Sequence, residues 1–263
     1  MSRMLRAMLL ATALSTPASA ETMTWNQANA VLMRLNHAIA KFPTLAQLYT
    51  ERGDVYYQLN DFHSAIENYS AAIKLDDQQS RAYFGRGMAY GRMGLMDEGI
   101  ADLGVFIARH PTDSVAYTKR GVRNIWRGNL EDAQRDLTRA VELDPTNAEA
   151  HDDLGVVHAK HNRLSIAAEH FVTAIRLDPG YQKAYHNLAI CRFMTGQLQA
   201  ALDVVDAGLT LDADNRSSLM LKSAILQALG REQEANEIGG RAEFLPEDNW
   251  SERSAIGTIK KEK

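Results

Sequence analysis

The sequence predicts an all-α protein, built as a right-handed α-solenoid of helix–turn–helix hairpins between capping helices. Three observations predict this fold. A small residue returns every thirty-four positions, at Gly53, Gly87, Gly121, Gly155 and Ala189. Glycine or asparagine follows seven positions later in each case, at Asn60, Gly94, Gly128, Asn162 and Gly196, and again at Gly230. Proline closes three successive repeats, at Pro111, Pro145 and Pro179. A fixed period of about 20–50 residues is typical of a solenoid.

Residues 1–20 are expected to be a secretory signal peptide. They contain a positively charged start, an apolar run over 7–14 and a small-residue cleavage motif that ends at Ala20. The apolar run is shorter than the roughly 18 residues that a membrane-spanning helix needs. An uncleaved amphipathic N-terminus is the alternative. This segment, on a chain with a single cysteine, predicts a bacterial periplasmic or secreted protein that is cleaved near Ala20.

Residues 21–45 are expected to form an N-terminal capping helix that is half of one repeat. Thr24 and Gln27 match a capping box, in which each side chain accepts the other residue's backbone N–H. Pro43 is expected to end the helix because proline lacks a backbone N–H. One period further on, the same pattern belongs to the second helix of a hairpin. A half repeat at the end of a solenoid covers an apolar face that water would otherwise reach.

Five complete tandem repeats are expected over 46–215, at 46–79, 80–113, 114–147, 148–181 and 182–215, and the positions within a repeat are here called places one to thirty-four. Each repeat reads as two helices joined by a turn at place fifteen, where Gly or Asn accepts a left-handed backbone. Small residues at places eight and twenty let the two helices approach closely. A large residue at place twenty-four is expected to fill the space beside them, at Tyr69, Leu103, Leu137, Phe171 and Val205.

The repeat pattern fades at the end of the chain. Residues 216–246 are expected to form a degenerate repeat that acts as the C-terminal cap, because Gly239 and Gly240 weaken its second helix. Residues 247–263 are expected to be a polar tail. Trp250 is the exception there, and it either docks back on the last repeat or contacts a partner.

Composition and motifs argue against several classes of function. The net charge of −4 and the pI near 6.1 give no basic surface for nucleic acid. No later apolar run is long enough for an integral membrane span. The sequence contains no nucleophile elbow, zinc-protease motif or phosphate-binding loop, so no catalytic residue and no cofactor are predicted and the chain is not expected to be an enzyme. The acidic side chains are interpreted as solvated surface charges.

Cysteine and histidine give no sign of a reactive centre. Cys191 is the sole cysteine, which excludes an intramolecular disulfide, and its apolar neighbours predict a buried and inert thiol. His151, His158 and His161 lie on one expected helix, but a zinc site needs three or four ligands that converge in space. His151 occupies a place that an aromatic residue holds in other repeats, so it is interpreted as a packing substitute. No metal site is predicted.

The repeated residues resemble the tetratricopeptide repeat over about residues 25–245. They are an aromatic residue at place four, a small residue at place eight, tyrosine at place eleven in two repeats, alanine at place twenty and proline at place thirty-two. The resemblance implies a scaffold that binds other proteins through places two, five, nine, twelve and thirteen. The apolar residues at these places are expected to form a continuous strip: Phe84, Met88, Val122, Ile125, Trp126, Val156, Ile190 and Phe193.

Such a strip suits an extended peptide or an amphipathic helix, with Trp126 as an anchor. The alternative is that part of the strip is ordinary core, covered by neighbouring helices or by the N-terminal helix folding inward. We therefore expect a non-enzymatic adaptor in the bacterial periplasm that binds a protein or peptide partner. The second hypothesis is a structural, self-associating subunit of an envelope assembly, in which the strip is a homo-oligomer interface. The sequence does not identify the partner.

Overall fold

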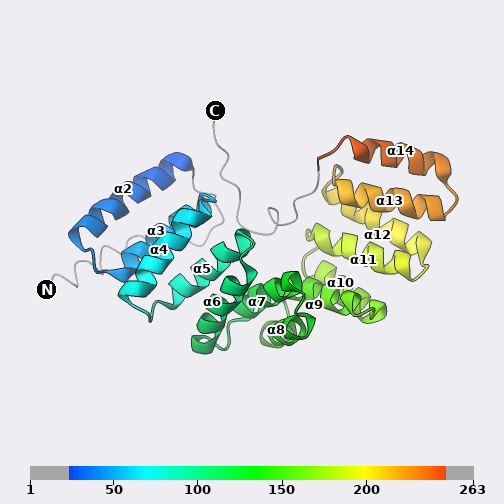
Figure 1. Cartoon of the computed structure of the whole chain (residues 1–263). Helices are drawn as coiled ribbons and strands as arrows, with labels where there is room; N and C mark the ends of the chain where they lie inside the picture. The colour runs from blue at the N-terminus through cyan, green and yellow to red at the C-terminus, as the bar shows by residue number, and fades with distance from the viewer. Residues whose placement is uncertain (1–23, 247–263) are drawn as a thin grey trace. The chain divides into compact units, whose positions relative to one another are not determined.

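The computed structural model describes residues 24–246, and the predicted signal peptide and the polar tail with Trp250 lie outside this range. Within 24–246 the backbone forms thirteen α-helices and no strand (Figure 1). In chain order they are α2 (Trp25–Lys41), α3 (Ala46–Gln58), α4 (Phe62–Leu75), α5 (Ser80–Arg92), α6 (Met96–Arg109), α7 (Ser114–Arg127), α8 (Leu130–Leu143), α9 (Ala148–Lys160), α10 (Leu164–Leu177), α11 (Gln182–Met194), α12 (Leu198–Leu211), α13 (Arg216–Ala228) and α14 (Glu232–Glu243). The predicted all-α repeat fold is confirmed.

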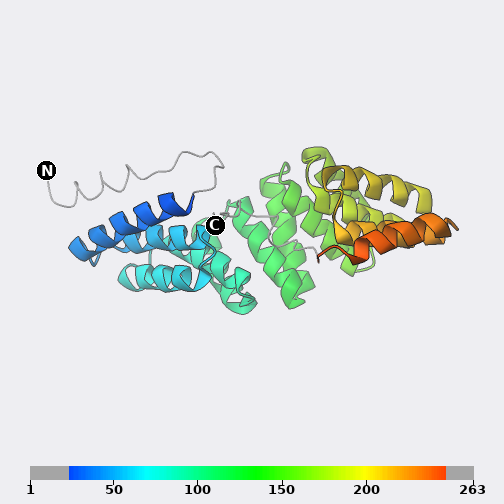
Figure 2. The ribbon, with the colours of Figure 1, turned by 90° about the horizontal axis from the view of Figure 1, so that it is seen from above.

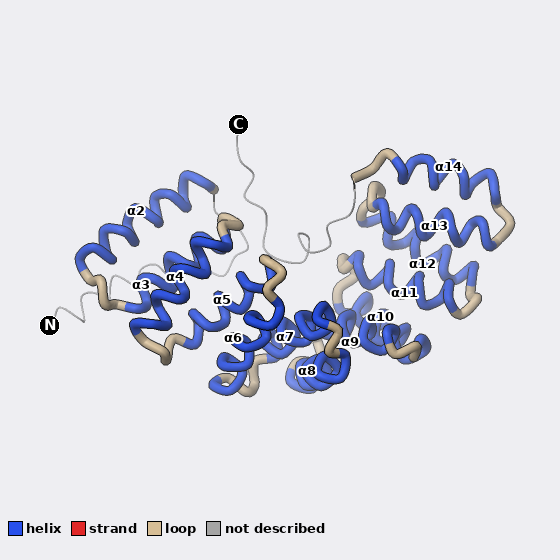
Figure 3. The backbone as a smooth tube through the Cα atoms, in the orientation of Figure 1, coloured by secondary structure: helices blue, strands red, loops and turns tan. Residues whose placement is uncertain are grey.

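From α3 onward the helices alternate as the first and second members of six hairpins. Hairpin 1 is α3–α4, hairpin 2 is α5–α6, and so on to hairpin 6, which is α13–α14; short turns join the two helices (Figure 3). The six residues predicted to be left-handed all have positive φ, from 58° at Asn60 and Asn162 to 85° at Gly128. No other residue in 24–246 has positive φ. The turn prediction is therefore confirmed at every hairpin.

The small residues at place eight lie against the large side chains at place twenty-four. A methyl group at Gly155 would lie 2.6 Å from the ring of Phe171, and one at Gly121 would lie 2.7 Å from Leu137. Both large side chains are fully buried, so neither has free space in which to move. This close approach confirms the packing role predicted for the thirty-four-residue glycine spacing.

The N-terminal capping helix begins and ends as predicted. The backbone N–H of Thr24 donates to Gln27 Oε1 at 2.7 Å, and the backbone N–H of Gln27 donates to Thr24 Oγ1 at 3.3 Å. Helix α2 ends at Lys41, immediately before Phe42 and Pro43. It lies along hairpin 1 (Figure 2), where Leu35 packs in one cluster with Leu48 and Val55 of α3. Helix α2 therefore covers an apolar face of α3.

The described residues separate into two compact units, 24–106 and 107–246, with the boundary inside α6. Each unit is described by itself below. In the C-terminal unit the first helices form a row, because α7 contacts α9, α9 contacts α11, and α11 contacts α13. No helix in 24–246 combines the length and the apolarity that crossing a lipid bilayer requires.

The interpretation of the acidic side chains as solvated charges is wrong for four aspartates. Asp102, Asp136, Asp152 and Asp153 are all buried. Burying a carboxylate is costly unless a cation and hydrogen-bond donors accompany it. Each of these four aspartates has such partners, and together they form two kinds of polar contact.

The first kind of polar contact joins the two helices of a hairpin. Arg86 at place seven donates to both carboxylate oxygens of Asp102 at place twenty-three, at 2.7 and 2.9 Å. Arg120 does the same to Asp136, at 2.9 and 2.6 Å. Hairpin 1 keeps a neutral version, in which Arg52 Nε donates to the amide oxygen of an asparagine at place twenty-three, at 2.6 Å. The contact recurs with the period of the repeat, so the sequence could have revealed it.

Candidate protein-binding surface

The eight predicted surface residues divide between the two compact units. Phe84 and Met88 lie on α5 in the N-terminal unit, and the other six lie on α7, α9 and α11 in the C-terminal unit. Seven of the eight are half-buried, whereas Trp126 is 74% exposed. The surface is therefore built separately for each unit.

In the C-terminal unit the predicted residues form the half-buried floor of the first-helix row. Val122, Val156 and Ile190 hold place nine on three successive first helices, of which α9 contacts both α7 and α11. Several neighbours also touch the core: Ile125 packs beside Leu137, and Phe193 packs beside Val205. These side chains thus fill the core on one side and leave apolar surface on the other.

Large exposed apolar side chains also lie on the first helices of this unit. Val115, Trp126, Met194 and Met220 are 48%, 74%, 61% and 47% exposed, and all four lie on first helices, at places two, thirteen, thirteen and five. Exposed apolar side chains that gather on one face typically mark an interaction site. Met220 was missed because the last repeat was interpreted as a cap. We call these four residues, together with the other five predicted residues of this unit, the first-helix surface.

The second kind of polar contact joins successive first helices of this unit. Lys119 on α7 donates to both carboxylate oxygens of Glu149 on α9, at 2.6 Å. Lys183 on α11 lies 3.0 Å from a carboxylate oxygen of Asp152 and 2.9 Å from one of Asp153, both on α9. These ion pairs fix the separation of neighbouring first helices, and with it the spacing of the apolar floor.

The pair around Lys183 is the more deeply buried of the two. The side chain of Asp152 is fully buried, and its second oxygen accepts from Asn187 Nδ2 at 2.9 Å. Burial disfavours the charged ammonium, but the carboxylates of Asp153 and Asp152 outweigh it and raise the pKa of Lys183 well above its usual value. Lys183 therefore stays protonated. The sequence signal was available, because in both ion pairs the partners are thirty residues apart.

The N-terminal unit presents a more polar first-helix face. The ring of Phe84 lies 5.0 Å from the ring of Phe106, which makes Phe84 a packing residue on one side. Asp54 on α3 accepts a 2.7 Å hydrogen bond from Tyr69 Oη and pairs with Arg81 at 2.7 Å. Burial raises the pKa of Asp54 despite both contacts. This face offers less continuous apolar surface than the C-terminal unit.

His151 takes over the role of the tyrosine at place four. The hydroxyls of Tyr49 and Tyr185 donate to the backbone carbonyls of Pro43 and Pro179, six residues earlier. His151 Nε2 makes the equivalent contact with the Pro145 carbonyl, at 3.2 Å. The interpretation of His151 as a packing substitute is confirmed. Across the described part of the chain, no group of three or more His, Cys, Asp or Glu side chains is placed to hold a metal ion.

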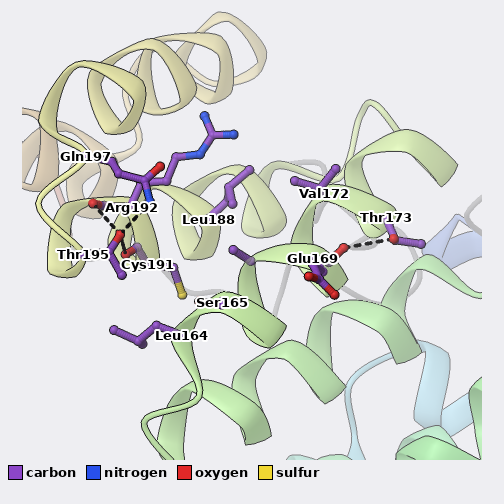
Figure 4. Close-up of a pocket in the computed structure, with 11 residues that line it drawn as sticks. Leu164, Ser165, Glu169, Val172, Thr173, Leu188, Cys191, Arg192, Thr195 and Gln197 are labelled. Atoms are coloured by element: carbon purple, nitrogen blue, oxygen red, sulfur yellow. Dashed lines mark hydrogen bonds between the residues drawn. The ribbon is translucent and has the colours of Figure 1, made fainter.

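A pocket of about 440 Å³ is lined by residues of α10 and α11 and of the turn after α11 (Figure 4). Leu164, Leu188 and Cys191 supply apolar wall, whereas Glu169 and Arg192 supply charge. Cys191 is buried, and burial raises the pKa of its thiol. The prediction of a buried thiol is confirmed. A thiol that stays protonated is a poor nucleophile, which agrees with the predicted inertness.

Comparison with protein-family models gives four matches. A family described as TPR repeat matches residues 53–94, and families described as tetratricopeptide repeat match 81–113, 127–165 and 158–225. Together these matches span 53–113 and 127–225, which is more than half of the chain. A comparison with curated protein sequences finds no match.

Solved structures with a similar fold include three that illustrate its range. A chain of the APC/C hetero-tetramer Cut9-Hcn1 aligns with a TM-score of 0.67 at 18% identity, over 82% of this chain and 46% of that one. PilW, a type IV pilus biogenesis factor, aligns with a TM-score of 0.68 at 21% identity, over 73% and 90%. YrrB, a TPR protein with an unusual peptide-binding site, aligns with a TM-score of 0.58 at 22% identity, over 72% and 97%. At these identities the likeness is one of fold alone.

Proposed function

Because this chain belongs to the tetratricopeptide repeat family, whose members generally mediate protein–protein interaction, we propose that it is a non-enzymatic adaptor whose first-helix surface binds an apolar segment of a partner protein. The observation that carries the proposal is the pairing of exposed Trp126 and Met194 with the half-buried floor of Val122, Val156 and Ile190. Such a surface accepts an extended peptide or one face of an amphipathic helix.

The geometry favours a partner segment over a small molecule. The apolar residues are spread across α7, α9, α11 and α13 instead of converging on one enclosed cavity. Ion pairs join α7 to α9 and α9 to α11 and hold these helices at fixed separations, so little ordering of the adaptor is needed on binding. Trp126 supplies a large, amphipathic side chain at the edge of the floor, which is the kind of residue that dominates binding energy at protein interfaces.

We place the adaptor in the bacterial periplasm, or outside the cell, on the strength of the signal-peptide pattern at residues 1–20. Mass spectrometry of the mature protein from a periplasmic extract tests this location. An N-terminus immediately after Ala20 is expected. Recovery from the cytoplasm with residues 1–20 intact would contradict it.

Capture of the partner from intact cells by crosslinking and mass spectrometry tests the binding function. Trp126→Ala is expected to reduce recovery of the partner at least tenfold, as is typical of an interface anchor. Ile190→Asp is expected to abolish recovery because it places a charge in the apolar floor. Trp25→Ala is the matched control, since Trp25 is also exposed, at 53%, but lies on α2 in the N-terminal unit.

The helical circular dichroism of Trp126→Ala should match that of the natural chain, because the side chain is largely exposed. Equal capture by Trp126→Ala and Trp25→Ala would contradict the proposed surface. The competing hypothesis, self-association through the same surface, is tested by light scattering across a concentration series. If the molar mass stays that of a monomer at every concentration, a homo-oligomer is excluded.

A further inference from the structure

Three imidazoles lie together inside hairpin 4. His151 and His158 come from α9, and His170 comes from α10. The Nδ1 atoms of His151 and His170 are 3.3 Å apart. The ring of His158 stacks on the ring of His170, with an interplanar angle of 5° and 5.4 Å between centroids. We call these three residues the histidine cluster.

The surroundings of the histidine cluster disfavour positive charge. His151 and His158 are buried, and His158 Nδ1 is buried without a hydrogen-bond partner. The charged groups that act on the cluster from α9, α10 and the turn between them are basic or become so: Arg176 acts on His151, and Arg163 and His161 act on His158. A positive charge on these imidazoles is therefore repelled by the neighbouring basic groups.

The repeat pattern explains why no carboxylate offsets this charge. His170 holds place twenty-three, which is Asp102 in hairpin 2 and Asp136 in hairpin 3. Leu154 holds the facing place seven, where those hairpins have arginine. Hairpin 4 thus has neither member of the ion pair. In place of the carboxylate it has an imidazole with two imidazole neighbours.

We propose that the histidine cluster is a pH-sensitive switch, in which protonation loosens the contact between α9 and α10 when the surroundings become acidic. Helix α9 carries Val156 of the first-helix surface and the two aspartates that pair with Lys183. Loosening it disorders the middle of that surface. The conformational change stands by itself, whereas its effect on partner binding rests on the proposed function.

The pH window follows from the protonation of the closed and open hairpins. Burial lowers the pKa of all three imidazoles, and the neighbouring histidines lower that of His170 further, to about 4. An open hairpin has histidines with a pKa near 6.5. Well above pH 6.5 the three histidines are unprotonated in both states, so they add no pH dependence to the stability. As the pH falls from about 6.5 towards 4, protons bind the open state preferentially and stability is lost. At pH 5, His170 alone shifts the opening equilibrium roughly thirtyfold.

Amide hydrogen exchange of the natural chain at pH 7.5 and pH 5.0 tests the switch, after correction for the intrinsic pH dependence of exchange. Protection of α9 and α10 is expected to fall roughly thirtyfold at pH 5.0 relative to protection of α5 and α6. His170→Val is the key variant. It gives hairpin 4 the residues found at the same two places in hairpin 5, Leu188 and Val204, and should remove most of the loss.

His151→Tyr is the second variant, which keeps the proposal testable if His170→Val does not fold. It restores the tyrosine found at place four in other repeats and removes one neighbour of His170, so a smaller loss of protection is expected. An equal response to pH in the natural chain and in the variant that folds would overturn the switch. Exchange needs no partner, so that result would leave the capture experiment with Trp126→Ala unaffected, and failure of that capture would leave the switch intact.

Discussion

Hairpins 3 and 4 share a backbone frame but fill the same two facing places differently. Both have glycine at place eight against a large buried side chain, and both turn through a left-handed residue. Hairpin 3 joins its helices through Arg120 and Asp136, whereas hairpin 4 has Leu154 and His170 there. The frame is therefore set by the small and left-handed positions. Places seven and twenty-three can hold an ion pair or an apolar residue with an imidazole.

The two arrangements differ in how much each side chain depends on the side chain that faces it. A buried ion pair stabilises little in total, but removing one member leaves a costly unpaired charge. An apolar contact loses only the packing of the atoms that are removed. The stability of hairpin 3 is thus sensitive to single substitutions at these places. The stability of hairpin 4 is sensitive to pH.

The largest effect is expected when the ion pair of hairpin 3 is broken from one side. Arg120→Leu leaves the buried carboxylate of Asp136 with a 3.2 Å hydrogen bond from Asn124 Nδ2 but without its cation. The free energy of unfolding should fall by about 3 kcal/mol. Urea denaturation monitored by circular dichroism measures this. A change below about 0.5 kcal/mol would show that the pair behaves as a surface ion pair.

A somewhat smaller effect is expected at place eight, where hairpins 3 and 4 each have a glycine. Gly155→Leu places side-chain atoms against the buried ring of Phe171 and should lower the free energy of unfolding by roughly 1–3 kcal/mol. Gly240→Leu is the matched control, because Gly240 is also in a helix but has open space around it. Thermal melts of both variants compare them. Equal melting temperatures would contradict the packing role of the glycine.

The smallest effect is expected when hairpin 3 is converted to the apolar version. Arg120→Leu combined with Asp136→Val gives it the residues that hairpin 5 has at places seven and twenty-three. The double variant should lie within about 1 kcal/mol of the natural chain or be more stable, because no buried charge is left unpaired. The same urea titration reports this. A loss as large as that of Arg120→Leu alone would contradict the argument that the unpaired carboxylate of Asp136 causes the destabilisation.

The repeat frame could be predicted from sequence because its requirements are local. Asn60 and Gly94 indicate a left-handed turn by residue type alone, and the same kind of residue recurs with the fixed period at six positions. The buried charges could not be recognised one residue at a time. Asp153 resembles a surface residue until Lys183, thirty positions later, is recognised as its partner.

The repeat places that form the candidate surface could be predicted, but the burial of each side chain at those places could not. The family pattern indicated which places face outward on the first helices, and Trp126 is indeed well exposed. Thr50 and Thr118 share place five with Phe84 but are fully buried, and each hydroxyl is satisfied by a hydrogen bond to a carbonyl of its own helix. Burial at one place varies between repeats because it depends on the size of the neighbours in the adjacent hairpin.

The ion pairs between first helices also specify the order in which the hairpins assemble. Place six of one hairpin meets place two of the next, as Lys119 with Glu149 and Asp153 with Lys183. If hairpin 5 docked directly on hairpin 3, Lys119 would face Lys183. If hairpin 4 of one chain docked on hairpin 4 of another, Asp153 would face Glu149. Both errors bring like charges together, so the alternation of sign disfavours skipped repeats and exchange between chains, to which arrays of similar hairpins are prone.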